Sequence, residues 1–150
     1  MKQLKFYRLN EPGGFMSNFY RSNLHIYGRN WTTVEHAYQA QKCLDEKEYN
    51  EIHEAKTPRI ARNLGQVCKM RKDWDSVKYS VMKDCCRAKF TQDEFLKQEL
   101  LNTGDDFLIE DSPVDWYWGC GSDGKGQNML GKVLMEIREE LRNGKDKETA

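Results

Sequence analysis

The chain has 150 residues, the length of one domain that can bury about 70% of its unfolded surface. It carries 24 Lys and Arg and 24 Asp and Glu, and the resulting zero net charge argues against a general nucleic-acid coat, which needs a basic excess. Charged residues make up 32% of the sequence and no apolar run approaches about 18 residues, so we expect a soluble protein without membrane contact.

The first third of the sequence predicts a small β element. Apolar residues 4–7 precede a turn at 12–14, and residues 24–31 alternate apolar and polar around a Gly28-Arg29-Asn30 turn. That alternation around a turn is typical of a hairpin. An isolated hairpin is only marginally stable, so this element needs helices packed against it.

From Thr32 onward the pattern is helical. Thr32 and Glu35 have the spacing of a capping box, which predicts a helix from Thr32 to about Leu44. Thr57 followed by Pro58 predicts a helix that ends near Gly65. The remaining expected elements are helices over about 46–55, 73–90, 95–101 and 130–141, and a short strand over 107–109.

These elements predict a mainly α fold. We expect a compact single helical domain over residues 1–142 with a small β element at its N-terminal end. Gly144 can end the last helix, and charged residues follow it, so residues 143–150 are expected to form a disordered tail.

Cysteine and histidine usage indicates a reducing compartment and no metal. The five cysteines are odd in number and contain no Cys-x-x-Cys, and the three histidines lack metal-ligand spacing. With no apolar signal segment at the N-terminus, a cytoplasmic location is expected. Cys85 and Cys86 have the character of core residues. Cys120 is a weak candidate nucleophile, because no histidine lies near it in the sequence.

The most informative stretch runs from Asp115 to Gly131. It places a carboxylate, two indoles and a glycine-rich loop directly before an amphipathic helix. Glycines allow close backbone approach, a helix start offers N–H groups to an anion, and indoles stack on flat rings. The stretch therefore predicts a site for a flat, phosphorylated ligand; the alternative is a simple connection.

A second candidate is a line of polar side chains on the helix after Thr32. Glu35, Gln39 and Lys42 follow at i, i+4 and i+7, with Tyr38 beside them. One interpretation is a solvated stripe. The functional interpretation is a polar cleft wall in which Glu35 and Lys42 tune each other's protonation.

Three further residues have both a structural and a functional interpretation. Asn18 can form part of a turn or bind a base or sugar. Arg62, one turn after Arg59, can belong to a solvated basic face or hold a phosphate through its guanidinium fork. Trp74 fits a core position at a helix start better than a stacking platform.

Glu35 and Asp115 would provide two acids from distant parts of the chain. Two carboxylates around a scissile bond are the usual equipment for cleaving a glycoside through an oxocarbenium-like transition state. The sequence leaves open whether these two side chains meet.

Taken together and in order, the motifs resemble the NADAR family over about residues 14–142. The motifs are Ser17-Asn18-Phe19, Trp31-x-Thr33-Val34-Glu35-His36-x-x-Gln39-Ala40-x-Lys42, Ala61-Arg62-x-x-Gly65, Trp74-x-x-Val77-Lys78, Lys89-Phe90, Leu101-x-Thr103-Gly104, Glu110, Asp115-x-x-Trp118-Gly119, Gly126-x-Asn128-x-Leu130-Gly131 and Leu134-Met135-x-Ile137-Arg138. Each motif is short, but the ordered set is specific.

The resemblance implies a mainly α fold and hydrolysis of a C–N bond between ribose and a base or amine, without metal or cofactor. Members of the family act on early riboflavin-pathway intermediates or remove ADP-ribose from nucleobases such as guanine in DNA. The resemblance points to catalytic Glu35, Lys42 and Asp115 and to substrate-binding Asn18, Arg62, Trp74, Trp118, Gly119 and Asn128.

Several alternatives stay open at this point. The substrate is a ribosylaminopyrimidine phosphate or an ADP-ribosylated base, the latter with local contact to the nucleic acid that carries it, and we expect a monomer. Lys42 either positions a carboxylate or attacks C1′ of an opened ribose to form an imine. A module that binds ADP-ribose without cleaving it is the alternative function, although two acids favour catalysis.

Overall fold

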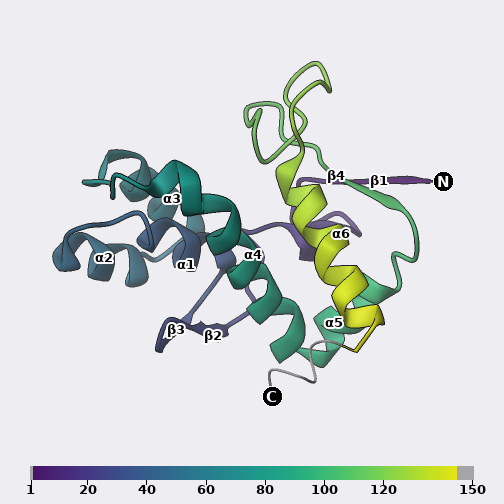
Figure 1. The fold of residues 1–150 in the computed structure, drawn as a ribbon, viewed down its shortest axis with the longest axis horizontal. Helices are drawn as coiled ribbons and strands as arrows, with labels where there is room; N and C mark the ends of the chain where they lie inside the picture. Colours follow the sequence, from purple (N-terminus) through teal and green to yellow (C-terminus); the bar gives the residue numbers. More distant parts are fainter. Residues whose placement is uncertain (1, 145–150) are drawn as a thin grey trace. The chain divides into compact units, whose positions relative to one another are not determined.

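The structure is a computed structural model that describes residues 2–144 (Figure 1). The mainly helical fold predicted from the sequence is confirmed, with six α-helices and two two-stranded sheets in that range. In chain order the elements are β1 (Gln3–Phe6), a 3₁₀ turn (Gly14–Met16), β2 (Leu24–Ile26), β3 (Arg29–Trp31), α1 (Val34–Ala40), α2 (Glu46–His53), α3 (Pro58–Val67), α4 (Trp74–Gln92), α5 (Glu94–Leu101), β4 (Phe107–Glu110) and α6 (Met129–Arg142).

The chain divides into two units. The first comprises residues 1–20 and 90–150, and the second is the continuous segment 21–89. The single domain over 1–142 therefore stays a prediction. Of the predicted disordered tail, Asn143 and Gly144 are described and end α6, with Gly144 at a φ of 74°, while residues 145–150 lie outside the described residues.

In the second unit, β2 and β3 form the predicted antiparallel hairpin, in which Leu24 pairs with Trp31. The turn residues are Tyr27 and Gly28, with φ of 56° and 73°. The turn thus comes earlier than predicted, and Arg29 already belongs to β3. Two successive positive φ values match the right-handed twist of a hairpin.

The N-cap of α1 lies one residue later than predicted, and the helix ends earlier. Its N-cap is Thr33, whose side chain accepts a hydrogen bond from the His36 N–H. The prediction of a capping box at Thr32 is therefore wrong. The helix stops at Ala40 because the following backbone pairs with another segment: Arg71 N–H donates to the Lys42 carbonyl at 2.9 Å.

All seven residues of α1 are buried, and the helix packs against α2 and α3. Its polar residues are therefore held by internal hydrogen bonds, as buried polar groups require. His36 is an example: its Nδ1 lies 2.8 Å from Thr33 Oγ1 and its Nε2 lies 2.9 Å from the Ala55 carbonyl oxygen. Burial lowers the pKa of His36.

α3 starts as predicted, with Thr57 accepting a hydrogen bond from the Ile60 N–H and Pro58 in the first turn. It continues to Val67, so Gly65 does not end it. Gly65 is instead a buried residue inside the helix.

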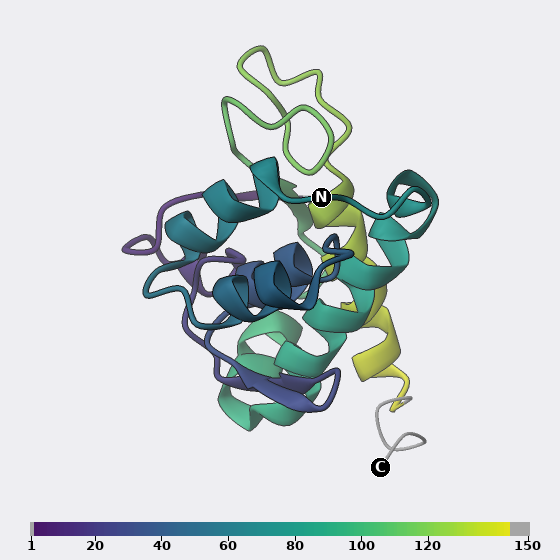
Figure 2. The same ribbon diagram turned by 90° about the vertical axis from the view of Figure 1, so that its left-hand side faces the viewer.

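In the first unit, β1 pairs with β4 in parallel, so that Gln3 lies opposite Phe107 and Phe6 opposite Glu110. α6 packs against β4 and α5 (Figure 1). Its predicted apolar stripe is confirmed as buried: Leu130, Val133, Leu134, Ile137 and Leu141. The segment 111–128 extends beyond the N-terminal end of α6 (Figures 1 and 2).

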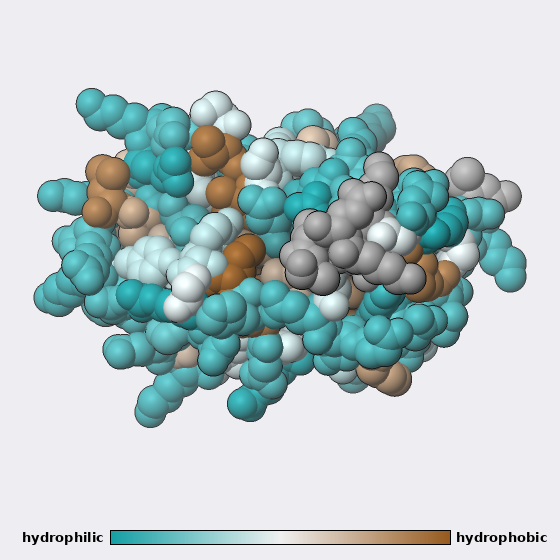
Figure 3. Space-filling view, turned by 60° about the horizontal axis from the view of Figure 1, so that its bottom comes forward, coloured by the Kyte–Doolittle hydropathy of each residue, from teal (hydrophilic) through white to brown (hydrophobic). Residues whose placement is uncertain are grey.

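The face seen in Figure 3 is mostly hydrophilic, with separate small apolar patches, as the high charged content leads one to expect. Within residues 2–144, no helix has both the length and the apolar character of a membrane span.

Candidate active site

The second unit holds a buried acid. Glu35, in the first turn of α1, is 7% exposed. Its Oε2 accepts a hydrogen bond of 2.7 Å from Nε2 of Gln39, one helical turn later. The sequence placed both residues on one face, and the structure buries that face instead of leaving it as a solvated stripe.

Lys42 lies just after α1 and is half-buried. Its Nζ is 5.9 Å from the centre of the Tyr38 ring and 6.0 Å from that of Trp74. The two rings are 5.2 Å apart and inclined by 59°. The ammonium therefore sits at the edge of the range for cation–π attraction to both rings.

The pKa of Lys42 is lowered from its ordinary value, chiefly because burial disfavours the charged form. The carboxylate of Glu35 acts in the opposite direction, and the guanidinium of Arg62 lowers the pKa further. Glu35 and Arg62 thus both lie within electrostatic reach of Lys42. The effect of Glu35 on the pKa of Lys42 agrees with one half of the predicted mutual influence, although Lys42 lies after α1 and not on it.

Trp74 and Arg62 complete this group. Trp74 is the first residue of α4 and is 5% exposed, which fits the core position favoured by its sequence context. Arg62 is half-buried on α3, whereas Arg59 is exposed. Their contact with substrate stays a prediction.

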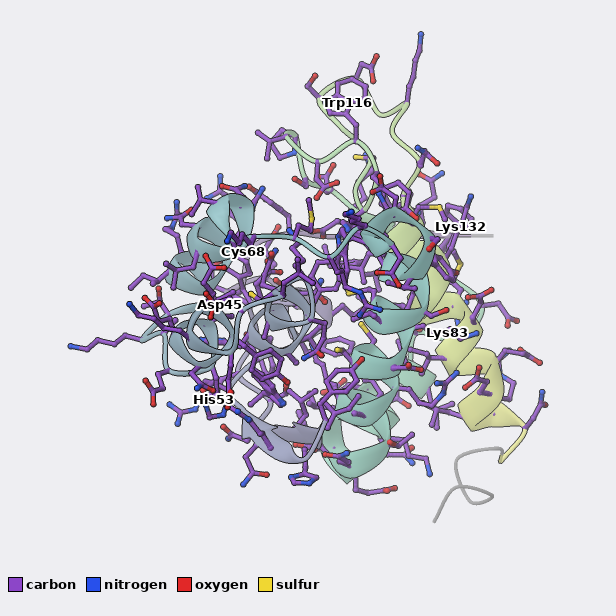
Figure 4. The ribbon with its side chains drawn as sticks, turned by 60° about the vertical axis from the view of Figure 1, so that its left-hand side comes forward. Asp45, His53, Cys68, Lys83, Trp116 and Lys132 are labelled. Carbon is purple, nitrogen blue, oxygen red and sulfur yellow. The ribbon has the colours of Figure 1, made fainter. Side chains whose placement is uncertain are left out.

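Sequence reasoning did not single out the sulfur atoms beside this group. Burial, and next the side-chain hydrogen bond with Cys68, raise the pKa of Cys43 to about 12. Cys68 follows the end of α3 (Figure 4). The two cysteines are 25 positions apart in the sequence, so no local pattern could reveal the contact.

Lys89 was also missed as a candidate, although it belongs to a motif of the family. It is 1% exposed near the end of α4, and burial lowers its pKa to about 8. Cys85 and Cys86 on the same helix are buried, as predicted.

In the first unit, Asp115 shapes its own loop. Its Oδ1 accepts hydrogen bonds from the N–H groups of Tyr117 at 3.1 Å and Trp118 at 2.7 Å. Its own N–H donates to Ser112 Oγ at 3.2 Å. The two predicted acids belong to different units, and the catalytic role of Asp115 stays a prediction.

The aromatic residues of this loop differ in exposure. Trp118 is half-buried and meets the Tyr117 ring edge-on, with centres 4.7 Å apart. Trp116 is 47% exposed on the loop beyond α6 (Figure 4). Its ring lies against Gly121, where an added Cβ would be 2.6 Å from the indole.

The prediction that the first N–H groups of α6 hold a phosphate is wrong. The N–H groups of Asn128, Met129 and Leu130 donate to carbonyls of the preceding loop, at 3.0, 2.9 and 3.0 Å. The loop folds back over the helix start and uses these donors, so they are not available to an anion.

Asn128 connects the same region to β4. Its Oδ1 accepts from the Glu110 N–H and its Nδ2 donates to the Leu108 carbonyl, both at 2.9 Å. Its φ of 53° places it in the left-handed region, which Asn tolerates better than most residues. The structure thus gives Asn128 a clear structural task, and its binding of substrate stays a prediction.

The remaining candidates in this unit have ordinary surroundings. Gly119 is buried, and a Cβ there would lie 2.9 Å from that of Ser112. Asn18 is half-buried after Ser17, whose Oγ accepts from the Phe19 N–H, as in a turn. Burial and a hydrogen bond to Asp111 raise the pKa of Cys120, which disfavours the thiolate that a nucleophile requires.

Across residues 2–144, no group of three or more His, Cys, Asp or Glu side chains is arranged to hold a metal ion. The side chains gathered around Lys42 in the second unit supply a carboxylate, an amine of lowered pKa and a guanidinium.

Comparison with known proteins gives consistent matches. The model of the NADAR domain matches residues 5–142. The chain is 44% identical to N-glycosidase Npun_R5314 of Nostoc punctiforme, with 92% of each chain covered. It is 43% identical to N-glycosidase YbiA of Escherichia coli K12, covering 92% of this chain and 88% of YbiA.

The NMR structure of E. coli YbiA superimposes with a TM-score of 0.89 at 42% identity, covering 96% of this chain and 87% of that one. A riboflavin biosynthesis protein of Vibrio vulnificus, VVA0006, is 41% identical over 91% of this chain but only 38% of its own length.

Proposed function

Because this chain belongs to the NADAR family, we propose that it is an N-glycosidase that hydrolyses the C–N bond between ribose and a base or amine in a phosphorylated ribosyl compound. Two relatives that match over most of both lengths carry the name N-glycosidase. The enzyme class follows from these relatives, and the chemistry of the bond is supported by the residues of the second unit.

The observation that carries the proposal is the buried carboxylate of Glu35 within electrostatic reach of Lys42. Departure of a base leaves positive charge on C1′ of the ribose, and a carboxylate held in a buried position stabilises that charge more strongly than one in water. Glu35 is buried and hydrogen-bonded, and its negative charge raises the pKa of Lys42. Arg62 supplies a guanidinium suited to a phosphate group.

In the hydrolytic route, a water molecule adds its oxygen to C1′ as the C–N bond breaks, and the departing nitrogen takes up a proton. Glu35 stabilises the charge at C1′ or receives the proton of the water. Lys42, in its charged form, orients this carboxylate.

The lowered pKa of Lys42 also supports the imine route. There, the neutral amine forms a bond to C1′ of a ring-opened ribose, and the base leaves as a free amine. Water then hydrolyses the imine and restores the lysine. Both routes give the same products, ribose phosphate or ADP-ribose and the released base or amine.

Two substrates fit the proposal: a ribosylaminopyrimidine phosphate of early riboflavin synthesis and ADP-ribosylated guanine in nucleic acid. Both contain ribose, an N-glycosidic bond and a 5′-phosphate. The similarity to VVA0006, which is named a riboflavin biosynthesis protein, supports the first.

The test is incubation with each substrate separately, following release of ribose phosphate or of ADP-ribose. We expect turnover of one of them by the wild type and a loss of about 100-fold or more in Glu35→Gln. Glu51→Gln, at an exposed position of α2, is the matched control and should retain full activity. Binding of either compound without C–N cleavage would instead assign the chain to the non-catalytic binding modules.

A further inference from the structure

Gln39 is a buried amide that the proposed chemistry does not use directly. It is 5% exposed on α1, and its Nε2 donates to Glu35 Oε2 at 2.7 Å. Pairs of this spacing on exposed helix faces contribute little, because water competes for both groups. Here both partners are buried, so the amide fixes one oxygen of the carboxylate and, through it, the orientation of the whole group.

Gly65 of α3 provides the space for this amide. A Cβ at Gly65 would overlap the Gln39 Oε1 atom and lie 2.8 Å from the carbon of its carboxamide. Glycine inside a helix is unfavourable relative to alanine, so its presence there needs a local reason. Contact with the Gln39 side chain is that reason.

The other end of the amide is not fixed by hydrogen bonding. Within the described residues, Gln39 Oε1 is buried and has no hydrogen-bond partner. Buried polar atoms rarely lack a hydrogen-bond partner, so each such atom needs an explanation. The amide is thus held by its bond to Glu35 and by its packing against Gly65.

We propose that Gln39, seated against Gly65, is a positioning residue that holds the carboxylate of Glu35 in the orientation required for hydrolysis. This inference rests on the proposed catalytic role of Glu35. Gln39 acts through Glu35 and need not touch the substrate, whereas Gly65 acts by leaving room for Gln39.

The first experiment compares Gln39→Ala with the wild type over a range of pH. We expect kcat to fall about 10-fold or more, because orientation is lost, with KM within about two-fold. The N–H of Gln39 favours the ionised form of Glu35, so its loss should raise the pKa of Glu35. The acid limb of the kcat/KM profile should therefore move to higher pH. Gln39→Glu should move the limb further, since it adds a second carboxyl to the pair.

The groups that sense the Glu35 charge include Lys42 after α1 and Cys85 and Cys86 on α4, and all three are retained in these variants. The matched control is Gln98, whose Nε2 makes the same i, i+4 bond to Glu94 at 3.2 Å on an exposed face of α5. Gln98→Ala should change neither kcat nor the acid limb. Wild-type kcat and an unmoved limb in Gln39→Ala would overturn the proposal.

The second experiment tests the contact with Gly65 through a double-mutant cycle. Gly65→Ala should lower kcat and Tm in the wild-type background, because the added methyl displaces the amide. In the Gln39→Ala background the carboxamide is gone and only the Cβ of residue 39, 3.0 Å from the added methyl, remains, so Gly65→Ala should cost much less Tm than in the wild type. An equal loss of Tm in both backgrounds would show that Gly65 does not seat Gln39.

A measurement without substrate separates the positioning role of Gln39 from the proposed enzymatic function. In Gln39→Ala, the titration of the Glu35 carboxyl, followed by NMR, should move to higher pH. If the wild type cleaves neither substrate, the proposed function fails, while this titration and the Tm cycle still decide whether Gln39 holds Glu35. An unchanged titration in an active enzyme would overturn the positioning role alone.

Discussion

At the scale of single residues, the environment of Lys42 matters most. Burial favours the neutral amine, while the Glu35 carboxylate favours the ammonium, and burial is the larger effect. A lysine under these opposing influences can serve either as a charge that orients a carboxylate or as a nucleophile.

Lys42→Arg separates the two roles. Arginine keeps the positive charge but cannot supply a neutral amine, so only a positioning role survives the substitution. Under the imine route we expect activity to fall by about 100-fold or more, and borohydride added during turnover to trap an adduct on wild-type Lys42. Retained activity without a trapped adduct would establish Lys42 as a positioning charge.

Asp115→Asn is similarly informative. The Oδ1 of asparagine can accept the same two N–H groups, from Tyr117 and Trp118, so the loop and the melting temperature should be retained. If Asp115 is a catalytic acid, turnover should nevertheless fall about 100-fold. Normal turnover in Asp115→Asn, together with reduced stability in Asp115→Ala, would leave Asp115 with a structural role only.

Lys89 leads to a prediction about stability. Its pKa is about 8 in the folded chain against an ordinary value of 10.5, so between these pH values the unfolded state binds more protons. Stability should therefore rise as pH increases through this window, by about 1.4 kcal/mol for each unit of pKa difference. Lys89→Met should remove that rise, as measured by urea denaturation at pH 7, 8, 9 and 10. A wild-type stability that falls over the same range, to the same extent as in the variant, would contradict this assignment.

At the scale of elements, local signals explain what could be predicted. The cap Thr57 and the apolar stripe of α6 act within one or two helical turns, so the sequence pattern could predict them. Thr32 and Thr33 are both suitable caps, and the choice between them depends on His36, whose ring also bonds Thr33.

What could not be predicted depends on distant pairing. α1 ends early because the backbone at Lys42 and Leu44 pairs with residues 69–71. The same holds for the candidate site. The spacing of Glu35 and Lys42 in the sequence indicated that they are close, whereas the contact of Gln39 with Gly65 joins two helices and follows from no periodic pattern in the sequence.

The junction of α6 with β4 gives a prediction at this scale. Asn128→Ala removes both side-chain bonds to the β4 backbone and leaves buried polar groups unpaired, so we expect a loss of about 2 kcal/mol or more in unfolding free energy. Asn128→Gly allows the positive φ without strain, so it should recover part of the unfolding free energy that Asn128→Ala loses, but not the part due to the two side-chain bonds. Asn63→Ala, on an exposed part of α3, is the control. Denaturation curves that coincide for Asn128→Ala and Asn63→Ala would refute this role.

At the scale of the whole molecule, the second unit is one continuous stretch, whereas the first is built from both ends of the chain. α4 runs from Trp74 to Gln92 and so passes from one unit into the other without a break. The residues with the clearest chemistry, Glu35, Lys42 and Arg62, all belong to the continuous unit.

The pairing of β1 with β4 bears on how the protein is made. On a ribosome the N-terminus emerges first, and domains generally begin to fold in that order. Here β1 (Gln3–Phe6) pairs with β4 (Phe107–Glu110), so β1 stays unpaired until β4 has been synthesised. The whole continuous unit is synthesised between the two strands. During translation the nascent chain therefore exposes an unpaired strand edge, and a chaperone that shields this segment would protect the chain until its last third arrives.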